Sequence, residues 1–418
     1  MHGPEEIRGR VFVAASVFLM DFSPDFFDNP PMTENKQKTG YQGFEQGPIR
    51  PPSEARSLLV RVTRNCHWNR CAFCPVYKGT QFSIRPVDHV LRDLEAVARQ
   101  VEKLTHLSAG PGLLLEEDVR AAFAALPPDE TASFRAALSW YLSGMEAVFL
   151  QDADSLVLRP ALLIEILINL KILFPQVVRI TSYSRSETID RIPADQLHAL
   201  AAAGLNRIHV GLESGCDAVL TAMHKGATKE MQIRAGLKVK AAGMELSEYY
   251  LPGLGGIDLW REHAQDTADA MNRINPDFIR LRTLAIPEQT HLAEEVRAGR
   301  FRKCPDLLVA EEILLFLDIL EGVTGYLTSD HVLNLFPEME GRLPDDLPRM
   351  RDLLWRFLTM EPDTRFIYQL GRRLGIMSRL NEVEDRERTA EVLAQARRIG
   401  ATSENLDEIT DAIVRRFI

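Results

Sequence analysis

The 418-residue chain contains little cysteine, no excess of basic charge and no long apolar run. Its five cysteines do not suit a secreted disulfide framework, so a reducing cytoplasm is the expected compartment. The net charge of −10 argues against a generic nucleic-acid binder, although a local basic patch could still exist. The apolar run at residues 11–20 is shorter than the roughly 18 residues that a membrane span needs. We therefore expect neither a membrane nor a nucleic acid as a partner.

Three of the five cysteines, Cys66, Cys71 and Cys74, lie within nine residues, in the segment RNCHWNRCAFCP. Thiolates are soft ligands that select zinc, copper(I) or iron-sulfur clusters. A structural zinc site uses four protein ligands, whereas no second cysteine pair follows here and His67 directly adjoins Cys66. Three thiolates on a cubane cluster leave one iron open to bind a small molecule. This favours a [4Fe-4S] cluster, with a zinc site or a plain thiol cluster as the alternatives.

From residue 57 onward, short apolar runs alternate with helical patterns. Six runs are expected as strands, at residues 57–62, 147–150, 177–182, 207–211, 244–251 and 278–285. Helical periodicity separates them, at residues 88–103, 160–173, 194–203, 228–242 and 260–274. This alternation predicts an α/β fold with parallel strands and βαβ crossovers. Six units are too few for an eightfold barrel, so we expect an open partial barrel.

The composition divides the chain into three parts. Residues 1–56 read as an N-terminal arm, rich in Pro, Asp, Asn and Gly and partly disordered, with Met32 as a possible start. Residues 57–290 form the α/β part, with a helical insertion at about 106–145. Residues 291–418 read as a helical domain without strands, with helices expected at 310–320, 350–359, 367–375 and 386–399.

The cysteine segment resembles the radical S-adenosylmethionine (radical SAM) superfamily, whose usual pattern is Cys-x3-Cys-x2-Cys and is here Cys-x4-Cys-x2-Cys. Residues 206–226 (NRIHVGLESGCDAVLTAMHKG) resemble the Elongator-like and coproporphyrinogen-dehydrogenase-like branches. The resemblance covers about residues 58–287 and implies a partial (β/α)6 barrel. It also implies that Cys66, Cys71 and Cys74 hold three irons of a [4Fe-4S] cluster, whose fourth iron chelates S-adenosylmethionine.

The same resemblance implies further contacts to S-adenosylmethionine at the strand ends. Phe73 stands where the family has an aromatic residue that borders the adenine. Asp152 and Asp154 follow the second strand, where the family usually has a Gly-Gly-Glu-like motif for the amino group; an Asx-turn is the alternative. Ser182 and Ser184 follow the third strand, where related enzymes place a polar contact to ribose or carboxylate, and both also suit a turn.

Glu213 is the clearest of these candidates. It ends the fourth strand between Gly211 and Gly215, and a charged group at the end of a buried strand is costly without a partner. In the two branches a Glu or Gln at this place faces the cofactor. Lys225 falls where those branches often carry a basic residue near the S-adenosylmethionine carboxylate. No catalytic residue is predicted.

The resemblance implies an enzyme that reductively cleaves S-adenosylmethionine to a 5′-deoxyadenosyl radical, which abstracts hydrogen from an unidentified substrate, a small molecule or another class. Such an enzyme needs a reducing partner such as flavodoxin or ferredoxin. Two alternatives remain: an iron-sulfur electron carrier or sensor, and a zinc-stabilised binding module. A carrier would need neither six βα units nor polar residues at several strand ends.

Overall fold

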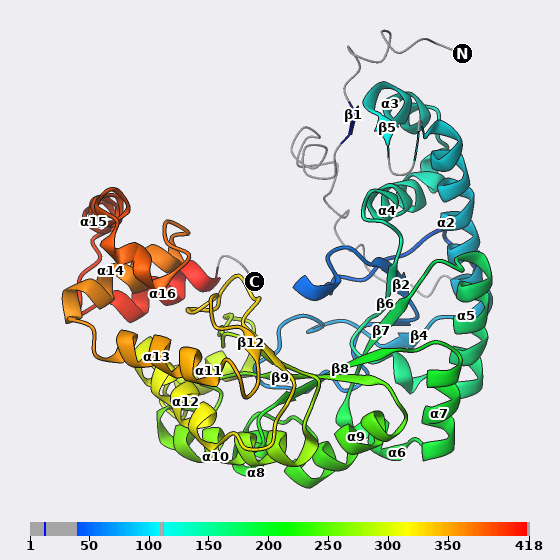
Figure 1. The fold of residues 1–418 in the computed structure, drawn as a ribbon. Coiled ribbons are helices and arrows are strands. Elements are labelled where there is room, and N and C mark those ends of the chain that lie inside the picture. Colours follow the sequence, from blue (N-terminus) through cyan, green and yellow to red (C-terminus); the bar gives the residue numbers. More distant parts are fainter. Residues whose placement is uncertain (1–11, 14–39, 109, 111–112, 416–418) are drawn as a thin grey trace. The chain divides into compact units, whose positions relative to one another are not determined.

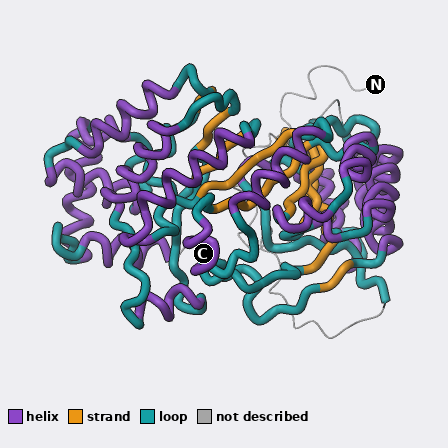
Figure 2. Tube along the Cα trace, turned by 90° about the horizontal axis from the view of Figure 1, so that it is seen from below, coloured by secondary structure: helices purple, strands orange, loops and turns teal. Residues whose placement is uncertain are grey.

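The computed structural model describes residues 12–13, 40–108, 110 and 113–415. The apolar run at 11–20, apart from Phe12 and Val13, lies outside the described residues, as do Met32 and most of the predicted arm. The chain divides into two compact units, which are described separately. The first consists of residues 1–67, 81–183 and 199–206, and the second of residues 68–80, 184–198 and 207–418. Both units contain strands and helices, which confirms the expected α/β class (Figures 1 and 2).

The first unit contains three parallel strands in the order β2, β6, β7. They are β2 (Leu58–Arg61), β6 (Ala147–Gln151) and β7 (Arg179–Ser184). Every residue of β6 is buried, as expected for a strand that is covered on both faces. Among the described residues of this unit, the strands are accompanied by the helices α2 (Val87–Leu107), α3 (Glu116–Ala124), α4 (Thr131–Leu142) and α5 (Pro160–Leu173). The short elements are β1 (Phe12–Val13), η3 (Pro52–Glu54), β3 (Thr63–Arg64), β4 (Ser83–Ile84), β5 (Leu114–Leu115), η4 (Pro128–Glu130) and η5 (Ser155–Val157).

The second unit contains four parallel strands and one antiparallel edge strand. They are β8 (Arg207–Glu213), β9 (Glu245–Tyr250), β10 (Phe278–Leu281), β11 (Tyr326–Thr328) and the antiparallel β12 (Gly341–Arg342). Its helices are α6 (Ser186–Arg191), α8 (Asp217–Ala222), α9 (Lys229–Ala241), α10 (Gly256–Ile274), α11 (His291–Arg297), α12 (Asp306–Ile319), α13 (Leu347–Leu358), α14 (Pro362–Arg373), η6 (Leu380–Glu384), α15 (Arg386–Ile399) and α16 (Leu406–Val414). Helix α7 (Ala194–Ala202) has residues in each unit.

The structure confirms all six expected strands and the four expected C-terminal helices. The expectation of no strand after residue 287 was wrong, because β11 pairs with β10 and β12 pairs with β11. These strands are only three and two residues long, so no hydrophobic period marks them in the sequence. No helix among the described residues is long and apolar enough to cross a bilayer. The three domain boundaries drawn from composition stay predictions.

Candidate functional site

The first unit holds the start of the cysteine loop through a buried carboxylate. Oδ2 of Asp152, directly after β6, accepts hydrogen bonds from Nε of Arg61 at 2.8 Å and from the backbone N–H of Asn65 at 3.0 Å. Arg61 ends β2, and Asn65 turns the chain with a φ of 66°. Charge-assisted hydrogen bonds of this kind are strong. Asp152 therefore ties two strand ends to the loop, and its predicted contact with S-adenosylmethionine stays a prediction.

Asp154 faces the residue next to the first cysteine. Its Oδ2 lies 3.6 Å from Nδ1 of His67, and the carboxylate is buried. The His67 ring also meets Phe82 edge-on, with centroids 5.7 Å apart. This contact involves Nδ1 and leaves Nε2, and metal-ligating histidines commonly direct their other ring nitrogen at a carboxylate. His67 as a fourth ligand therefore stays an alternative.

The two predicted serines bond to adjacent backbone. The hydroxyl of Ser182 donates to the carbonyl of Tyr183 at 2.9 Å, and that of Ser184 donates to the carbonyl of Arg185 at 3.4 Å. Both serines are buried. Hydrogen bonds to adjacent backbone are typical of turn residues, the alternative interpretation of these serines. Their contacts to the ribose or carboxylate of S-adenosylmethionine stay predictions.

In the second unit, the middle of the cysteine loop is fixed by backbone hydrogen bonds. The N–H of Ala72 donates to the carbonyl of Met223 at 2.9 Å, and the carbonyl of Ala72 accepts from Leu292 at 2.9 Å. The neighbouring Phe73 is half-buried against a core cluster that includes Ala72 and Met223. The loop is thus bound to the segment after α8 and to α11.

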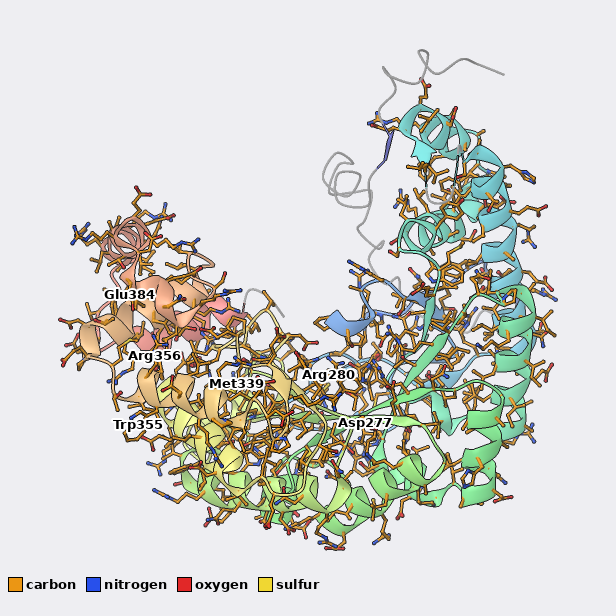
Figure 3. The ribbon with its side chains drawn as sticks, viewed as in Figure 1. Asp277, Arg280, Met339, Trp355, Arg356 and Glu384 are labelled. Atoms are coloured by element: carbon orange, nitrogen blue, oxygen red, sulfur yellow. The ribbon has the colours of Figure 1, made fainter. Side chains whose placement is uncertain are left out.

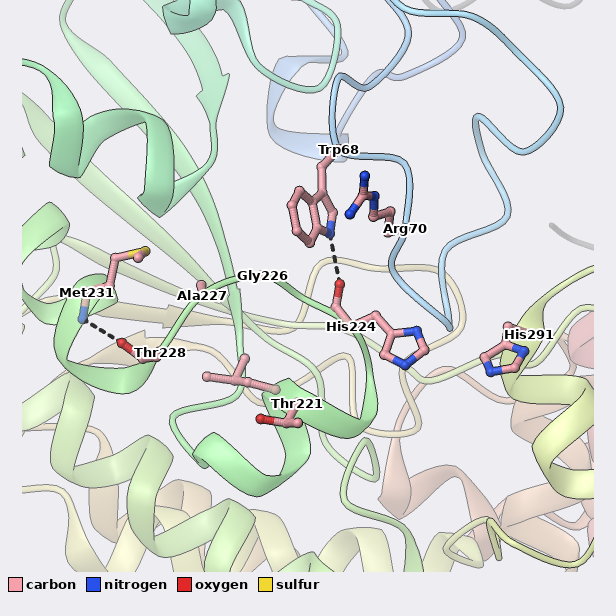
Figure 4. A pocket seen from close by; sticks show the side chains of 10 residues that line it. Trp68, Arg70, Thr221, His224, Gly226, Ala227, Thr228, Met231 and His291 are labelled. Carbon is pink, nitrogen blue, oxygen red and sulfur yellow. Dashed lines mark hydrogen bonds between the residues drawn. The ribbon is translucent and has the colours of Figure 1, made fainter.

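Trp68 connects this loop to the same segment. Its indole N–H donates to the carbonyl of His224 at 2.8 Å, as Figure 4 shows. The ring rests on Gly226, which has a φ of 71°, and a Cβ there would come within 2.3 Å of the indole. The guanidinium groups of Arg70 and Arg185 each lie 5.0 Å from the ring centre, within the range of cation–π attraction.

Glu213 and Lys225 lie together, as the resemblance implied. Nζ of Lys225 is 3.5 Å from Oε1 of Glu213, and both side chains are at most 16% exposed. Glu213 has a left-handed backbone, with a φ of 64°. A Cβ at Gly211 would come within 2.4 Å of its Oε1, so a larger residue there would displace this carboxylate. Glu213 and Lys225 thus form a partly buried ion pair near the carboxyl end of β8.

A second acid lies near this pair. Glu248, in β9, is fully buried, and burial raises its pKa well above the usual value. The charge of Glu213 raises that pKa further, whereas Lys225 lowers it. Burial therefore disfavours the charged form of Glu248, the second acid beside Lys225.

The segment that carries Glu213 is held from behind by α10. Nε2 of His263 lies 3.1 Å from the carbonyl of Leu251, which can only accept, so this nitrogen carries the proton. Nδ1 is then an acceptor and receives the Ser214 hydroxyl at 2.8 Å. Thr267, one turn further along α10, accepts from the N–H of Gly215 at 2.8 Å. Burial lowers the pKa of His263 to about 4, so the neutral ring persists at pH 7.

Helix α12 adds a buried acid to this network. The Glu312 carboxylate receives the Tyr250 hydroxyl at 2.7 Å and the N–H of Gly253 at 3.1 Å. Burial raises the pKa of Glu312 to about 8, although the two hydrogen bonds act in the opposite direction. Its Oε1 also lies 3.5 Å from Nε2 of His263. The loops after β8 and β9 are thus joined through one set of buried polar groups.

The cysteines have the chemistry that a three-thiolate cluster site requires. Cys71 is buried, and Cys66 and Cys74 are partly buried. Cys66 belongs to the first unit and the other two to the second. In the described part of the chain, no three His, Cys, Asp or Glu side chains converge as a metal site. The donor set fits the cluster, while its assembly on these three residues stays a prediction.

Sequence reasoning missed the residues that support the site. Arg185 lies over Trp68 and donates to the carbonyl of Lys225 at 2.6 Å. His263 and Glu312 meet only through folding, because 49 residues separate them. In the sequence, His263 and Thr267 are marked only by their helical spacing of four residues on α10.

The order of elements defines an α/β protein whose three-cysteine loop follows its first parallel strand. Residues 60–268, half of the chain, match the Radical SAM superfamily. The chain belongs to the radical SAM superfamily. Members of this superfamily use a [4Fe-4S] cluster and S-adenosylmethionine. The sequence matches none of the curated proteins.

Several solved structures are similar to this chain. Elp3 from the archaeon Methanocaldococcus infernus is 16% identical, with a TM-score of 0.36, over 44% of this chain and 48% of that one. TsrM from Kitasatospora setae, with cobalamin and a [4Fe-4S] cluster bound, is 15% identical, with a TM-score of 0.42, over 83% and 62%. HemN, the coproporphyrinogen III oxidase of Escherichia coli, is 16% identical, with a TM-score of 0.41, over 63% and 52%. The chain thus spans about half the length of the matched Elp3.

Proposed function

We propose that this protein is a radical SAM enzyme acting on an unidentified substrate. The observation that carries the proposal is the family match over residues 60–268, which includes the three-cysteine loop and the segment around Glu213. The chemistry that the bound cluster supplies is one-electron cleavage of S-adenosylmethionine to methionine and a 5′-deoxyadenosyl radical, which takes a hydrogen atom from a substrate carbon.

In this proposal Cys66, Cys71 and Cys74 hold the cluster. Their thiols are free of disulfides, and the middle of the loop is fixed to the segment after α8 through Ala72 and Met223. A loop that is already fixed pays less conformational entropy when it binds its cofactor. The protein's contribution is then to place the cofactor and to exclude water around it.

Glu213 and Lys225 are proposed to bind the amino-acid end or the ribose of S-adenosylmethionine. The carboxylate of Glu213 can accept from the ammonium or from hydroxyls, and the ammonium of Lys225 suits a carboxylate. The two side chains pair with each other at 3.5 Å, and bound S-adenosylmethionine would replace that contact. Phe73, Asp154, Ser182 and Ser184 are proposed as secondary contacts, and Asp152 as the residue that positions the loop.

A cluster of this kind needs an electron donor, so a flavodoxin or ferredoxin is the proposed reducing partner. An oxygen-sensitive cluster and a cysteine content that does not suit a secreted disulfide framework fit a reducing compartment such as the cytoplasm.

Anaerobic reconstitution tests the proposal. We expect about four irons per chain and loss of the cluster in Cys71→Ala. Cys304→Ala is the matched control, because Cys304 is also buried, lies outside the loop and has a pKa raised by burial to about 12. Full iron in Cys71→Ala, or equal loss in both variants, would contradict the ligand assignment.

A further inference from the structure

The cysteine loop lies in a long stretch without acidic residues. Between Glu54 and Asp88 the sequence contains no Asp or Glu, although the whole chain has a net charge of −10. Six basic residues occur in this stretch: Arg56, Arg61, Arg64, Arg70, Lys78 and Arg85. The most basic segment of an acidic protein is therefore the segment that carries its three clustered cysteines.

Three of these cations are neutralised within the first unit. Arg61 is paired with Asp152, and Arg64 is paired with Glu45 at 2.7 Å. Arg85 is paired with Asp93 at 2.6 Å. Their charges are internal to the fold, so they offer little to a partner.

Two cations in the second unit are in a different situation. Within the described ranges, neither Arg70 nor Lys78 has an acidic partner. Arg70 is exposed and lies over Trp68, while Nζ of Lys78 donates to the carbonyl of Asn69 at 3.0 Å. Both residues therefore present positive charge on the same loop, and Arg70 directly precedes Cys71.

An open pocket of about 820 Å³ adjoins this loop. Trp68, Arg70, His224 and His291 line it together with small and apolar side chains, and none of its lining residues is acidic (Figure 4). The rings of His224 and His291 are stacked, with centroids 5.5 Å apart. Two acids contact His291, Glu294 at 2.8 Å and Glu295 at 3.6 Å, and Glu295 is also paired with Arg300 at 2.7 Å. The loop and the pocket together form a surface with an aromatic centre and cations around it.

We infer that the surface formed by Trp68, Arg70, Lys78, His224 and His291 docks a small acidic electron-carrier protein. The inference rests on the proposed function. Carrier complexes have small, charge-steered interfaces, and steering raises the association rate of oppositely charged surfaces. Elsewhere the net charge of −10 would repel an acidic carrier, so a local cationic surface is needed.

The location also suits electron transfer. The surface includes residues 68 and 70 of the loop that carries the cysteines, so a docked carrier would lie beside the proposed cluster. In the transfer the carrier loses one electron and the cluster gains one, and no atom changes place. The chain's part is to hold the carrier there.

Charge reversal tests this docking surface directly. Flavodoxin is titrated into the anaerobic reconstituted protein at low ionic strength, and binding is followed by calorimetry. Arg70→Glu and Lys78→Glu should each weaken binding by roughly tenfold. Arg356→Glu is the matched control, because Arg356 is an exposed arginine on α13 without an acidic partner in the described chain (Figure 3). The difference in flavodoxin affinity between the wild type and the two loop variants should vanish near 0.5 M salt, where the Debye length is only a few ångströms.

A chemical reductant separates this inference from the proposed function. With dithionite, Lys78→Glu and the wild type should cleave S-adenosylmethionine at the same rate, whereas with flavodoxin the variant should be about tenfold slower. Equal flavodoxin affinity for wild type, Arg70→Glu and Lys78→Glu would overturn the docking surface, as would no binding of flavodoxin or ferredoxin to the wild type. Failure of the dithionite reaction in all proteins would instead contradict the proposed function.

Discussion

The hydroxyl of Ser214 donates a 2.8 Å hydrogen bond to Nδ1 of His263, and this bond holds the segment that carries Glu213. Ser214 directly follows Glu213, whose left-handed backbone needs support from its surroundings. Because the other nitrogen of His263 is bound to the Leu251 carbonyl, the ring cannot turn without breaking two bonds. The two residues therefore position Glu213 from outside the proposed binding site.

Ser214→Ala should loosen this support. The buried Nδ1 of His263 would lose its donor, at a cost of about 1–3 kcal/mol in the free energy of unfolding. Affinity for S-adenosylmethionine should fall as well, because Glu213 is less well placed. In a Glu213→Gln background, Ser214→Ala should cause little further loss of affinity. Additive losses in that double-mutant cycle, measured by titration, would show that Ser214 acts independently of Glu213.

Glu213→Gln should weaken S-adenosylmethionine binding by about 1.5–3 kcal/mol, the range for a hydrogen bond to a charged group. The amide keeps the shape of the side chain but loses its charge. Iron content and melting temperature should change little. Glu230→Gln, which removes an exposed partner of Arg273, is the control. If both variants bind the cofactor as tightly as the wild type, Glu213 is a structural acid.

Glu312 should make stability depend on pH. Its pKa is about 8 in the folded protein and near 4.5 when unfolded, so the folded state keeps a proton that the unfolded state releases. The free energy of unfolding should therefore fall as pH rises from 4.5 to 8, by at most about 1.4 kcal/mol per unit, and then level off. His263 acts in the other direction, since its lowered pKa costs stability only as pH falls from 6.5 towards 4.

Glu312→Gln isolates this effect. The glutamine has no proton to release, so the stability difference between wild type and variant should shrink between pH 6.5 and 8, where His263 no longer titrates. Urea unfolding of the apoprotein at several pH values in this range provides the measurement. A difference that is constant with pH would mean that Glu312 is ionised in the folded protein.

Substitution of two glycines with similar backbone angles can separate the cost of backbone strain from the cost of a steric clash. Gly226 and Gly243 have φ values of 71° and 79°, but only Gly226 faces a side chain, the indole of Trp68. Alanine at either position should cost about 1–2 kcal/mol of backbone strain. Gly226→Ala should cost a further 1–3 kcal/mol or so, because the ring must move, and it should also change the fluorescence of Trp68. Equal melting temperatures for the two variants would contradict the packing described for Trp68.

The sequence predicted the parts of the fold that repeat. The six strands and the helices between them were found because apolar periodicity is local, and the cysteine loop because its spacing is unusual. Glu213 was found because a charge beside glycines at a strand end is conspicuous, and the structure does bring Lys225 to it.

The rest depends on contacts between distant residues. The short strands β11 and β12 exist because an already formed neighbour offers them hydrogen bonds, not because of their own sequence. Likewise, the bond between Arg61 and Asp152 joins residues 91 positions apart. The supporting role of Asp152 therefore could not be predicted from its place after a strand.

The central claim is that this chain cleaves S-adenosylmethionine reductively. The most direct measurement is product analysis after the anaerobic, reconstituted protein is reduced with dithionite and mixed with S-adenosylmethionine alone. The account predicts slow formation of 5′-deoxyadenosine and methionine, which is absent in Cys71→Ala and retained in Cys304→Ala. S-adenosylhomocysteine as the only product, or no cleavage by a protein that holds its full iron, would contradict it.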